Sequence, residues 1–396
     1  MSARERAPLP KGYWTIWTTV ALDLVGFGIV VPILGVYAER FGASGYAVGW
    51  LFATFSLAQL VCAPLLGRLS DRIGRKPVII ISLVGTAIGS FVTGAAGALW
   101  VLFLGRIIDG ASGASLAVAQ AAVADIAEPE RRPPLVGMLG AAFGVGFVLG
   151  PAIGGLAALG GPHVPFYVAA ALAAINAVAA IIRLPETRKP DRTAAAAARR
   201  RFAVPGQPAL RHLAIVGFLT TFAFVAFEAT FSLFGKARFG LTEGSTAVVF
   251  LGIGLVLIAV QGGGFAKIAA RVPITRVYTA GLGLVVVGLV VVGVSEVWPL
   301  LIAGLLLLSL GQGVASPSLI EMVNRTAGED RRGEAMGFQQ SATAFGRVLG
   351  PPLAGSAYDR IGVWSPMVFG GAVTAAALVL VVVVWRMHGS MTTQSA

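Results

Sequence analysis

The chain has 396 residues, of which 56% are hydrophobic and 12% are charged, and its mean hydropathy is +0.83. This composition excludes an ordinary soluble two-domain protein of the same length. The formal net charge of +12 does not indicate nucleic-acid binding, because the basic residues follow the topology described below. The single cysteine, Cys62, excludes internal disulfides and cysteine metal sites, and the 3 histidines are scattered, so we expect no metal site.

Apolar stretches of about 20 residues recur along the whole chain, and this length crosses a bilayer as a helix. Spanning segments must be helices here, because a helix satisfies its own backbone groups in lipid. The 52 glycines fit this interpretation, since small residues let membrane helices approach closely. We therefore predict an all-α membrane protein with twelve transmembrane helices, at residues 13–36, 46–66, 77–96, 98–123, 134–158, 164–184, 212–234, 244–266, 276–294, 297–322, 334–357 and 364–386.

Lysine and arginine are distributed unevenly between the two sides of these spans. With the N-terminus in the cytoplasm, 24 of the 30 basic residues fall in cytoplasmic segments, and the outside loops hold only Arg40, Lys236, Arg238 and Arg360. An excess of positive charge marks the cytoplasmic side of membrane proteins. We expect a multi-pass protein of the inner (plasma) membrane with both termini in the cytoplasm.

The longest hydrophilic segment runs from Arg183 to about Arg211 and is basic and interrupted by proline. Its composition and its place after six spans are typical of a linker. The sequence therefore predicts an N-terminal six-helix half at residues 1–186, a cytoplasmic linker at 187–211 and a C-terminal six-helix half at 212–396.

The two halves contain a repeat. Residues 130–155 align without gaps with residues 330–355, at an offset of 200, and 10 of the 26 positions are identical. Both segments begin with a pair of arginines and share a Gly-Pro near the end. Two pseudo-symmetric six-helix halves related by a parallel repeat are an architecture of transporters, which bind substrate at the midplane between the halves.

The loop between the second and third spans, GRLSDRIGRKP at 67–77, is far more charged than its surroundings. It resembles the loop motif of the major facilitator superfamily, whose fold has two such halves. The residues that match the motif are Gly67, Asp71, Arg72, Gly74, Arg75 and Lys76.

Other segments extend the resemblance over nearly the whole chain. LGRIIDG (104–110) is similar to the family's fourth-span motif, with Arg106 as its arginine, and PET (185–187) is also typical. GAAFGVGFVLGPAIGG (140–155) resembles the fifth-span motif of drug:proton antiporters, and ALDLVGFGIVVPIL (21–34) resembles their first span. The similarity is greatest to the tetracycline and multidrug efflux branch.

Two departures from that branch concern acidic residues. Tetracycline exporters have an acid in the third span, where this sequence has Gly89, and the ninth span also lacks one. Both differences count against tetracycline itself as the substrate.

The resemblance implies that the loop motif is a conformational latch. Asp71 would dock against the start of the eleventh span, near Gly333, when the cytoplasmic side is closed. The alternative is a topological anchor, which accounts for the cations but not for Asp71 or the spacing of the glycines.

The glycines of the fifth span form four-residue ladders that suit close helix packing. The resemblance adds a seal between the halves that limits proton leak, although packing alone is the simpler explanation. The residues of this packing motif are Gly140, Gly144, Gly146, Gly150, Pro151, Gly154 and Gly155.

Charged residues within the spans are the candidates for proton coupling. Each costs about 2.5–3.5 kcal/mol at a helix centre, so we expect none of them to face lipid unpaired. Asp23 lies near mid-depth in the first span, and Glu228 is expected at a similar place in the seventh. Arg106 and Asp109 share a helix face and so can neutralise each other. The resemblance of the fourth span implies instead that Arg106 stabilises a nearby carboxylate, with Asp23 as the first candidate. Asp23 is the expected proton carrier, and Glu228 is a second carrier or a contact for a cation.

We predict a secondary active transporter and not an enzyme: it would export a lipophilic small molecule, such as a cationic drug, in exchange for protons. No nucleotide-binding or metal motif is present, so the proton gradient would be the energy source and no cofactor is expected. The alternatives are a sugar or metabolite exporter on the same fold and a non-transporting membrane sensor or scaffold. The expected partners are substrate, protons and the bilayer, without nucleic acid, and we expect a monomer. The candidate substrate contacts are Asp23, Gln59, Gln120, Phe227, Glu228, Gln339 and Arg347.

Overall fold

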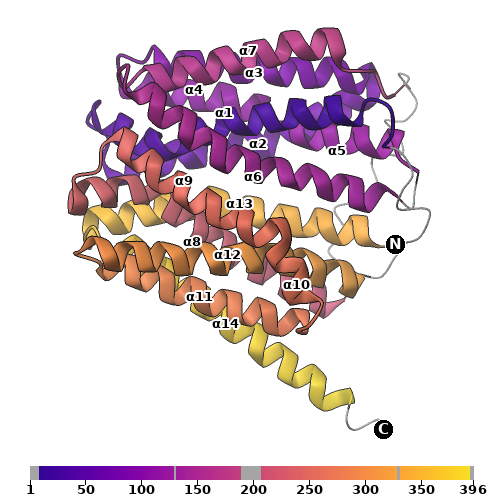
Figure 1. Cartoon of the computed structure of the whole chain (residues 1–396), viewed down its shortest axis with the longest axis vertical. Helices are drawn as coiled ribbons and strands as arrows, with labels where there is room; N and C mark the ends of the chain where they lie inside the picture. The colour runs from indigo at the N-terminus through magenta and orange to yellow at the C-terminus, as the bar shows by residue number, and fades with distance from the viewer. Residues whose placement is uncertain (1–8, 129–130, 189–206, 328–330, 393–396) are drawn as a thin grey trace. The chain divides into compact units, whose positions relative to one another are not determined.

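The computed structural model describes residues 9–128, 131–188, 207–327 and 331–392 (Figure 1). These residues form helices and contain no β-strand. The helices are α1 (Tyr13–Glu39), α2 (Gly45–Ile73), α3 (Arg75–Gly94), α4 (Leu99–Ser112), α5 (Ser115–Ile126), α6 (Arg132–Ala158), α7 (Val164–Arg183), α8 (Pro208–Phe239), α9 (Glu243–Ala259), the π-helix η4 (Val260–Gly264), α10 (Phe265–Ala269), α11 (Ile274–Val294), α12 (Trp298–Ala327), α13 (Arg332–Arg360) and α14 (Ser365–Thr392).

Within the described ranges, 11 segments are long and apolar enough to cross a membrane. α4 with α5, and α9 with η4 and α10, each make one such segment. The twelfth expected span lies within α13, which has 29 residues but is more polar than the others. The prediction of an all-α membrane protein is confirmed.

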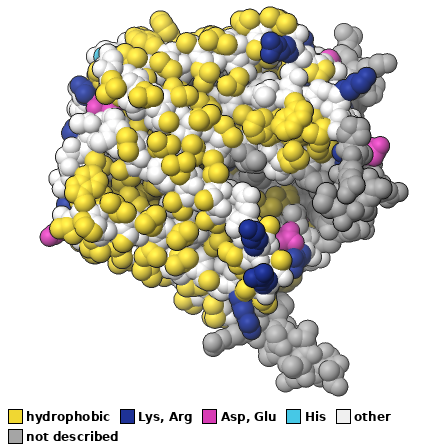
Figure 2. All heavy atoms as spheres, viewed as in Figure 1, with side chains coloured by type: hydrophobic (Ala, Val, Ile, Leu, Met, Phe, Trp, Pro, Cys, Tyr) yellow, Lys and Arg dark blue, Asp and Glu magenta, His cyan; other side chains and the backbone are white. Residues whose placement is uncertain are grey.

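The described surface is largely apolar. Hydrophobic side chains cover most of the face in Figure 2, and large ones such as Leu156, Leu159 and Ile182 are 71%, 83% and 74% exposed. Exposed apolar area on this scale marks a surface that contacts lipid or protein and not water. The chain is therefore a multi-pass membrane protein.

Contacts divide the chain into two compact units. Unit 1 consists of Met1–Val30 and Leu57–Arg200, and unit 2 consists of Val31–Ser56 and Arg201–Ala396. The division cuts through α1 and α2, so the end of α1 and the start of α2 belong by their contacts to the unit of the last six spans. We call this segment, Val31–Ser56, the hairpin. The sequence analysis, by contrast, divides the chain only once, at the linker of residues 187–211. That division stays a prediction.

In unit 1, α3 packs against α4 and α7, as Figure 1 shows. A core of small and branched side chains joins α1, α3, α5, α6 and α7. Tyr13 is fully buried in this core, and its hydroxyl donates a hydrogen bond to Leu135 O over 2.9 Å, which ties α1 to α6. This packing fixes the position of α1 and therefore of its acidic residue.

In unit 2, α8 packs against α13 and α14, and α11 packs against α12 and α14. Phenylalanines of α8 and α9 form the centre of the core. The Phe231 ring lies 5.2 Å from the Phe227 ring and 5.7 Å from the Phe250 ring, measured between centroids. The aromatic residues that crowd the seventh span therefore pack against one another in the core.

The glycines of α6 let this helix lie directly on α1. A Cβ at Gly146 would come within 2.6 Å of Leu24 O, and one at Gly150 within 2.5 Å of the Gly28 Cα. A Cβ at Gly154 would lie 3.1 Å from Ile29 O, so this glycine continues the ladder. One of the two predicted ladders is thus the contact surface between these helices.

The same contact recurs in unit 2, between α13 and α8. A Cβ at Gly346 would come within 2.8 Å of Phe218 O, and one at Gly350 within 2.6 Å of Phe222 O. Gly346 and Gly350 are offset by 200 from their counterparts on α6. The repeat found in the sequence is therefore also a repeat of helix packing.

Substitution of Gly150 tests this contact. Gly150→Ala places a methyl group against the α1 backbone, and overpacking of this kind costs about 1–3 kcal/mol. We expect a lower midpoint of thermal unfolding in detergent. Gly140→Ala is the matched control, because a Cβ there meets nothing within 4 Å and replacing a helical glycine by alanine gains about 0.5–1 kcal/mol. Equal midpoints for the two variants would contradict the packing argument.

Candidate functional site

The fourth span is broken between α4 and α5. α4 ends at Ser112 and α5 begins at Ser115, and Ala114 N donates to Ser112 O at 2.8 Å instead of continuing the helical pattern. A break leaves backbone groups without helical partners, and inside a membrane such groups need partners from the protein. Broken helices of this kind line the transport sites of many carriers.

Gln59 of α2 supplies one of these partners. Its Nε2 donates to Gly113 O over 2.8 Å. A Cβ at Gly113 would lie 2.7 Å from the same nitrogen, so the glycine permits the close approach. Gln59, predicted as a substrate contact, is engaged with the backbone of the break in this structure.

Asp23 of α1 lies at the start of α5. The Ser115 Oγ donates a hydrogen bond to Asp23 Oδ2. Ser115 is the first residue of α5 and is only 5% exposed. The N-terminal end of a helix favours negative charge, because its first amides lack acceptors within the helix. The broken span therefore presents two favourable features to this carboxylate.

Arg106 and Asp109 form an ion pair on α4. The Arg106 Nη2 lies 3.1 Å from Asp109 Oδ2, and the two residues are 2% and 7% exposed. Thr86 of α3 also hydrogen-bonds to the Asp109 side chain, and the Asp109 charge acts on Asp23. Two acids and one cation thus lie together in unit 1. The tuning of Asp23 by Arg106 stays a prediction.

Gly89, where tetracycline exporters carry an acid, is a helix-crossing residue in this chain. A Cβ there would lie 2.8 Å from both the N and the Cβ of Asp109, and 2.9 Å from Gly105 O. Gly288 and Gly304 make the same crossing between α11 and α12, with a Cβ at Gly288 lying 2.9 Å from Gly304 O. The close approach leaves no room for a side chain at position 89.

Glu228 of α8 is the buried acid of unit 2. It is 7% exposed, and its Oε1 has no hydrogen-bond partner among the described residues. Arg347 of α13 is the cation whose charge acts on it. A buried carboxylate oxygen without a partner is costly, so this site has unused capacity to bind a proton or a cation.

Glu228 does not take the place in α8 that Asp23 takes in α1. Gly146 of α6 contacts α1 at Leu24, and its counterpart Gly346 of α13 contacts α8 at Phe218. Leu24 and Phe218 are therefore equivalent positions, and the residue equivalent to Asp23 is Gly217. Glu228 lies 11 residues further along α8 (228 minus 217), a displacement of about 16 Å at 1.5 Å per residue. The expectation of similar places in the two spans does not fit this register.

The remaining predicted substrate contacts differ in their surroundings. Gln339 is 5% exposed, and neither atom of its amide has a hydrogen-bond partner among the described residues. Its Nε2 lies beside Gly217, which has no side chain to obstruct it. Phe227 is 1% exposed within the aromatic core, which favours a packing role, and Gln120 is half-buried on α5.

The α2–α3 turn holds a network of charges around Arg75, which is 6% exposed. Its guanidinium lies 2.9 Å from Asp71 Oδ1 and 2.9 Å from Asp125 Oδ2, and it donates to Ser70 Oγ over 2.7 Å. Arg188 also pairs with Asp71, at 2.8 Å. In this structure the predicted latch acid is neutralised within unit 1.

Glu186 caps the start of α3. Its carboxylate accepts from Arg75 N at 2.9 Å and from Lys76 N at 3.2 Å. Gly74 precedes the helix with φ of 105°, and a Cβ there would also meet the Glu186 carboxylate. Sequence reasoning noted PET only as a resemblance and missed this role, although an acid is the expected partner of a helix start.

Among the predicted latch residues, Gly74 and Arg75 organise this turn, while Arg72 is exposed and a Cβ at Gly67 meets nothing within 4 Å. The docking of Asp71 near Gly333 stays a prediction, because those two residues belong to different units.

A second group of polar contacts fastens the hairpin within unit 2, and sequence reasoning missed it. Asp359, near the end of α13, accepts from Gly45 N and Tyr46 N at 2.8 Å each and so caps α2. Arg40 donates to Glu243 over 2.7 Å. Close backbone contact accompanies these bonds, since a Cβ at Gly45 would lie 3.0 Å from Gly355 O.

A salt bridge adds to this group: the Lys236 Nζ lies 2.5 Å from Glu39 Oε2. Isolated exposed pairs of this kind contribute little. The capping of α2 and the backbone contact are therefore the firmer part of the attachment.

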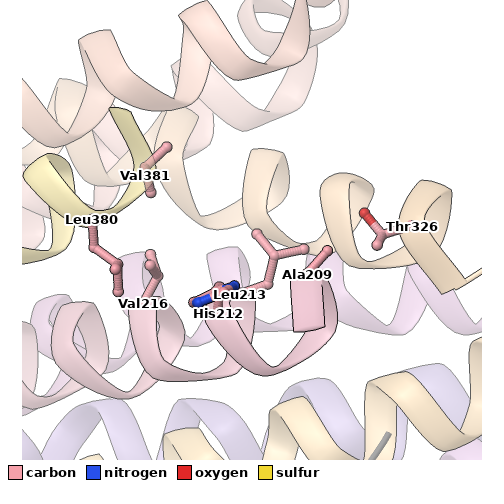
Figure 3. Close-up of a pocket in the computed structure, with 7 residues that line it drawn as sticks. All are labelled: Ala209, His212, Leu213, Val216, Thr326, Leu380 and Val381. Carbon is pink, nitrogen blue, oxygen red and sulfur yellow. The ribbon is translucent and has the colours of Figure 1, made fainter. Parts of the chain in front are cut away.

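A small pocket in unit 2 is lined by Ala209, His212, Leu213, Val216, Thr326, Leu380 and Val381 (Figure 3). It holds none of the predicted site residues and is almost wholly apolar. Nor does the described part of the chain contain a group of three or more metal-ligating side chains. The buried charges remain the candidate functional site.

Comparisons with known proteins agree with this geometry. A family profile described as the Major Facilitator Superfamily matches residues 16–278 and 265–395. Tetracycline resistance protein, class C, of Escherichia coli is 31% identical over 350 residues, which cover 86% of this chain and 88% of that protein. Multidrug resistance protein 1 of Bacillus subtilis (strain 168) is 29% identical over 374 residues, covering 93% of this chain and 95% of that protein.

Solved structures show the same fold. The crystal structure of the human organic anion transporter MFSD10 (TETRAN) matches with a TM-score of 0.71 and 26% identity, covering 96% of this chain and 100% of that one. The crystal structure of the nucleoside transporter NupG matches with a TM-score of 0.73 over 95% of this chain and 99% of that one, but at 16% identity this likeness concerns the fold alone.

Arg75 and Arg72 offer a matched test of the charge network. Arg75→Ala leaves Asp125 without its cation and Asp71 with Arg188 alone, and the loss of a hydrogen bond to a charged group costs about 1.5–3 kcal/mol. We expect a clear fall in the thermal unfolding midpoint. Arg72→Ala removes an exposed cation from the same turn and should leave the midpoint nearly unchanged. Similar losses in both variants would show that the turn needs only positive charge.

Proposed function

This chain belongs to the major facilitator superfamily and is a membrane transporter, and we propose that it exports a lipophilic small molecule in exchange for protons. The observation that carries the proposal is the placement of Asp23 in a broken-helix site. A carboxylate kept within a membrane span is costly, and here it lies at the start of α5, where the charge of Asp109, itself paired with Arg106, acts on it. Such a group is suited to gain and lose a proton in each cycle.

The exchange follows from charge balance at the site. When Asp23 is ionised, the site has room for one more positive charge, which a proton or a cationic substrate can supply. Binding of one disfavours binding of the other, which is the basis of antiport. An inward membrane potential supplies about 2.3 kcal/mol per charge per 100 mV, so one proton for each substrate molecule is a useful driving force. No cofactor takes part in this scheme.

The proposed substrate class rests on the names of the relatives and on two positions of this chain, Gly89 in unit 1 and Glu228 in unit 2. Relatives at about 30% identity are named for resistance to tetracycline or to multiple drugs. The absence of space for an acid at Gly89 argues against tetracycline itself. Glu228, with an oxygen that has no partner among the described residues, supports a cationic substrate as the narrower form of the proposal.

Transport by alternating access requires contacts that form in one state and break in the other. We propose that the hairpin contacts are such a set and lie on the outer side of the inner membrane, with both termini in the cytoplasm. Asp359 holds the start of α2 through two hydrogen bonds. In the opposite state the hairpin would leave α13, and Asp71 would leave Arg188 for the start of α13.

Transport by purified protein in liposomes tests the proton-carrier assignment. The probe is ethidium, a lipophilic cation, and the imposed driving force is a pH gradient. We expect gradient-driven ethidium movement in the wild type, its loss with a protonophore, and its loss in Asp23→Asn. The control variant is Glu296→Gln, which changes a carboxylate whose side chain is 77% exposed. Gradient-driven transport that persists in Asp23→Asn overturns the assignment, and transport in the wild type that ignores the gradient overturns antiport.

The hairpin contacts can be tested with spin labels on cysteines at positions 46 and 296, in a Cys62→Ser background. Asp359→Asn weakens the cap of α2 because a neutral amide binds the helix start less strongly than a carboxylate. We expect a larger population at long label separations than in the parent. Arg360→Ala is the neighbouring control, since Arg360 is exposed. Unchanged distance distributions in Asp359→Asn would remove the capping bond from the gating scheme.

A further inference from the structure

We propose that Ser115 is a positioning residue that links the proton state of Asp23 to the joint between α4 and α5. This inference rests on the proposed function, since it assumes that Asp23 takes up and releases protons. It adds a route by which that event could move a helix. The evidence is the place of Ser115 in the chain and the direction of its hydrogen bond.

Ser115 belongs both to the joint between α4 and α5 and to the contact with Asp23. It is the first residue of α5, directly after the break, and its hydroxyl donates to Asp23 Oδ2. On the other side of the break, Gln59 holds Gly113 O. The joint is therefore fastened to α2 through its backbone and to α1 through the Ser115 side chain.

The charge that acts on Asp23 comes from α4. Asp109 acts on Asp23 directly, and Arg106 is paired with Asp109 at 3.1 Å. The hydrogen bond to Asp23 among the described residues comes from Ser115. The hydroxyl is thus the neutral group that responds most directly to the proton on Asp23.

The bond must change when Asp23 is protonated. An ionised carboxylate only accepts hydrogen bonds, whereas a protonated one also has an O–H to donate, and a serine hydroxyl can do either. Hydrogen bonds to charged groups are stronger than neutral ones. Protonation therefore weakens the hold of α1 on the start of α5 and frees the joint to bend.

The second half lacks each part of this device. The crossing of Gly288 and Gly304 matches that of Gly89 and Gly105 at an offset of 199, so the residue equivalent to Ser115 is Val314. α12 runs through this region without a break. A valine cannot donate a hydrogen bond, and an unbroken helix has no joint to release. The device is therefore a property of the first half and not of the repeat.

The test is the pH dependence of ethidium–proton exchange by the full chain in liposomes. Ser115→Ala removes a donor that stabilises the charged carboxylate, so we expect the profile to move to higher pH by about one unit, the size expected for a hydrogen bond to a charged group. Ser115→Thr keeps the hydroxyl and should retain the wild-type profile. Ser309→Ala is the matched control in the other half, because Ser309 is 2% exposed and its hydroxyl donates only to Leu305 O of its own helix.

The outcomes separate this inference from the proposed function. A wild type without proton-driven exchange overturns both. If Asp23→Asn abolishes exchange while Ser115→Ala has the wild-type profile, Ser115 has no positioning role and the proton-carrier assignment stands. A shift in Ser115→Ala that Ser115→Thr does not show supports the inference.

Ser115→Cys covers the case in which the alanine variant does not fold. A thiol is a weak donor of similar size, so its profile should shift in the same direction as that expected for alanine. A folded Ser115→Cys with the wild-type profile overturns the inference.

Discussion

Charges inside the lipid must find their partners within the protein, and this constraint organises both units. Each unpaired charge in a span costs about 2.5–3.5 kcal/mol. Arg106 therefore pairs with Asp109, Asp23 accepts from Ser115, and Arg347 lies within electrostatic reach of Glu228. Wherever the partner is weak or shared, the group can change its protonation or its ligand, and those places are the candidates for function.

Close helix packing is what brings these groups together. The glycines of α6 and α3 allow backbone contact with α1 and α4, respectively, and this contact leaves little freedom in where the side chains between them can lie. Gly89 shows the consequence, because the space that an acid would need is filled by Asp109. A change of one glycine therefore alters both the packing and the set of charges that a site can hold.

Much of the fold was predictable, because spanning helices must be long and apolar. The repeat at an offset of 200 could also be found in the sequence. It identified the glycines through which α6 packs against α1 and α13 packs against α8. The site was predictable only as a set of charged residues in apolar runs. The break after Ser112, the engagement of Gln59 and the capping by Asp359 depend on residues far apart in the sequence, so no local pattern indicates them. The register of Glu228 could be assigned only from the contacts of Gly346.

The two halves repeat their packing but not their chemistry, and this difference bears on coupling. At the crossing shared by both halves, the first half has Asp109 where the second has Leu308, and Ser115 where the second has Val314. The buried acid of unit 2 lies about 16 Å beyond the position equivalent to Asp23, at the helix rise of 1.5 Å per residue. The duplicated scaffold therefore has one charged and one apolar version of the same crossing, and the proposed proton site has no counterpart at the matching place in unit 2. On the proposed function, the break between α4 and α5 has a use that α12 lacks: a span that responds to a proton needs a joint, whereas unbroken α12 has Val314 at the position of Ser115.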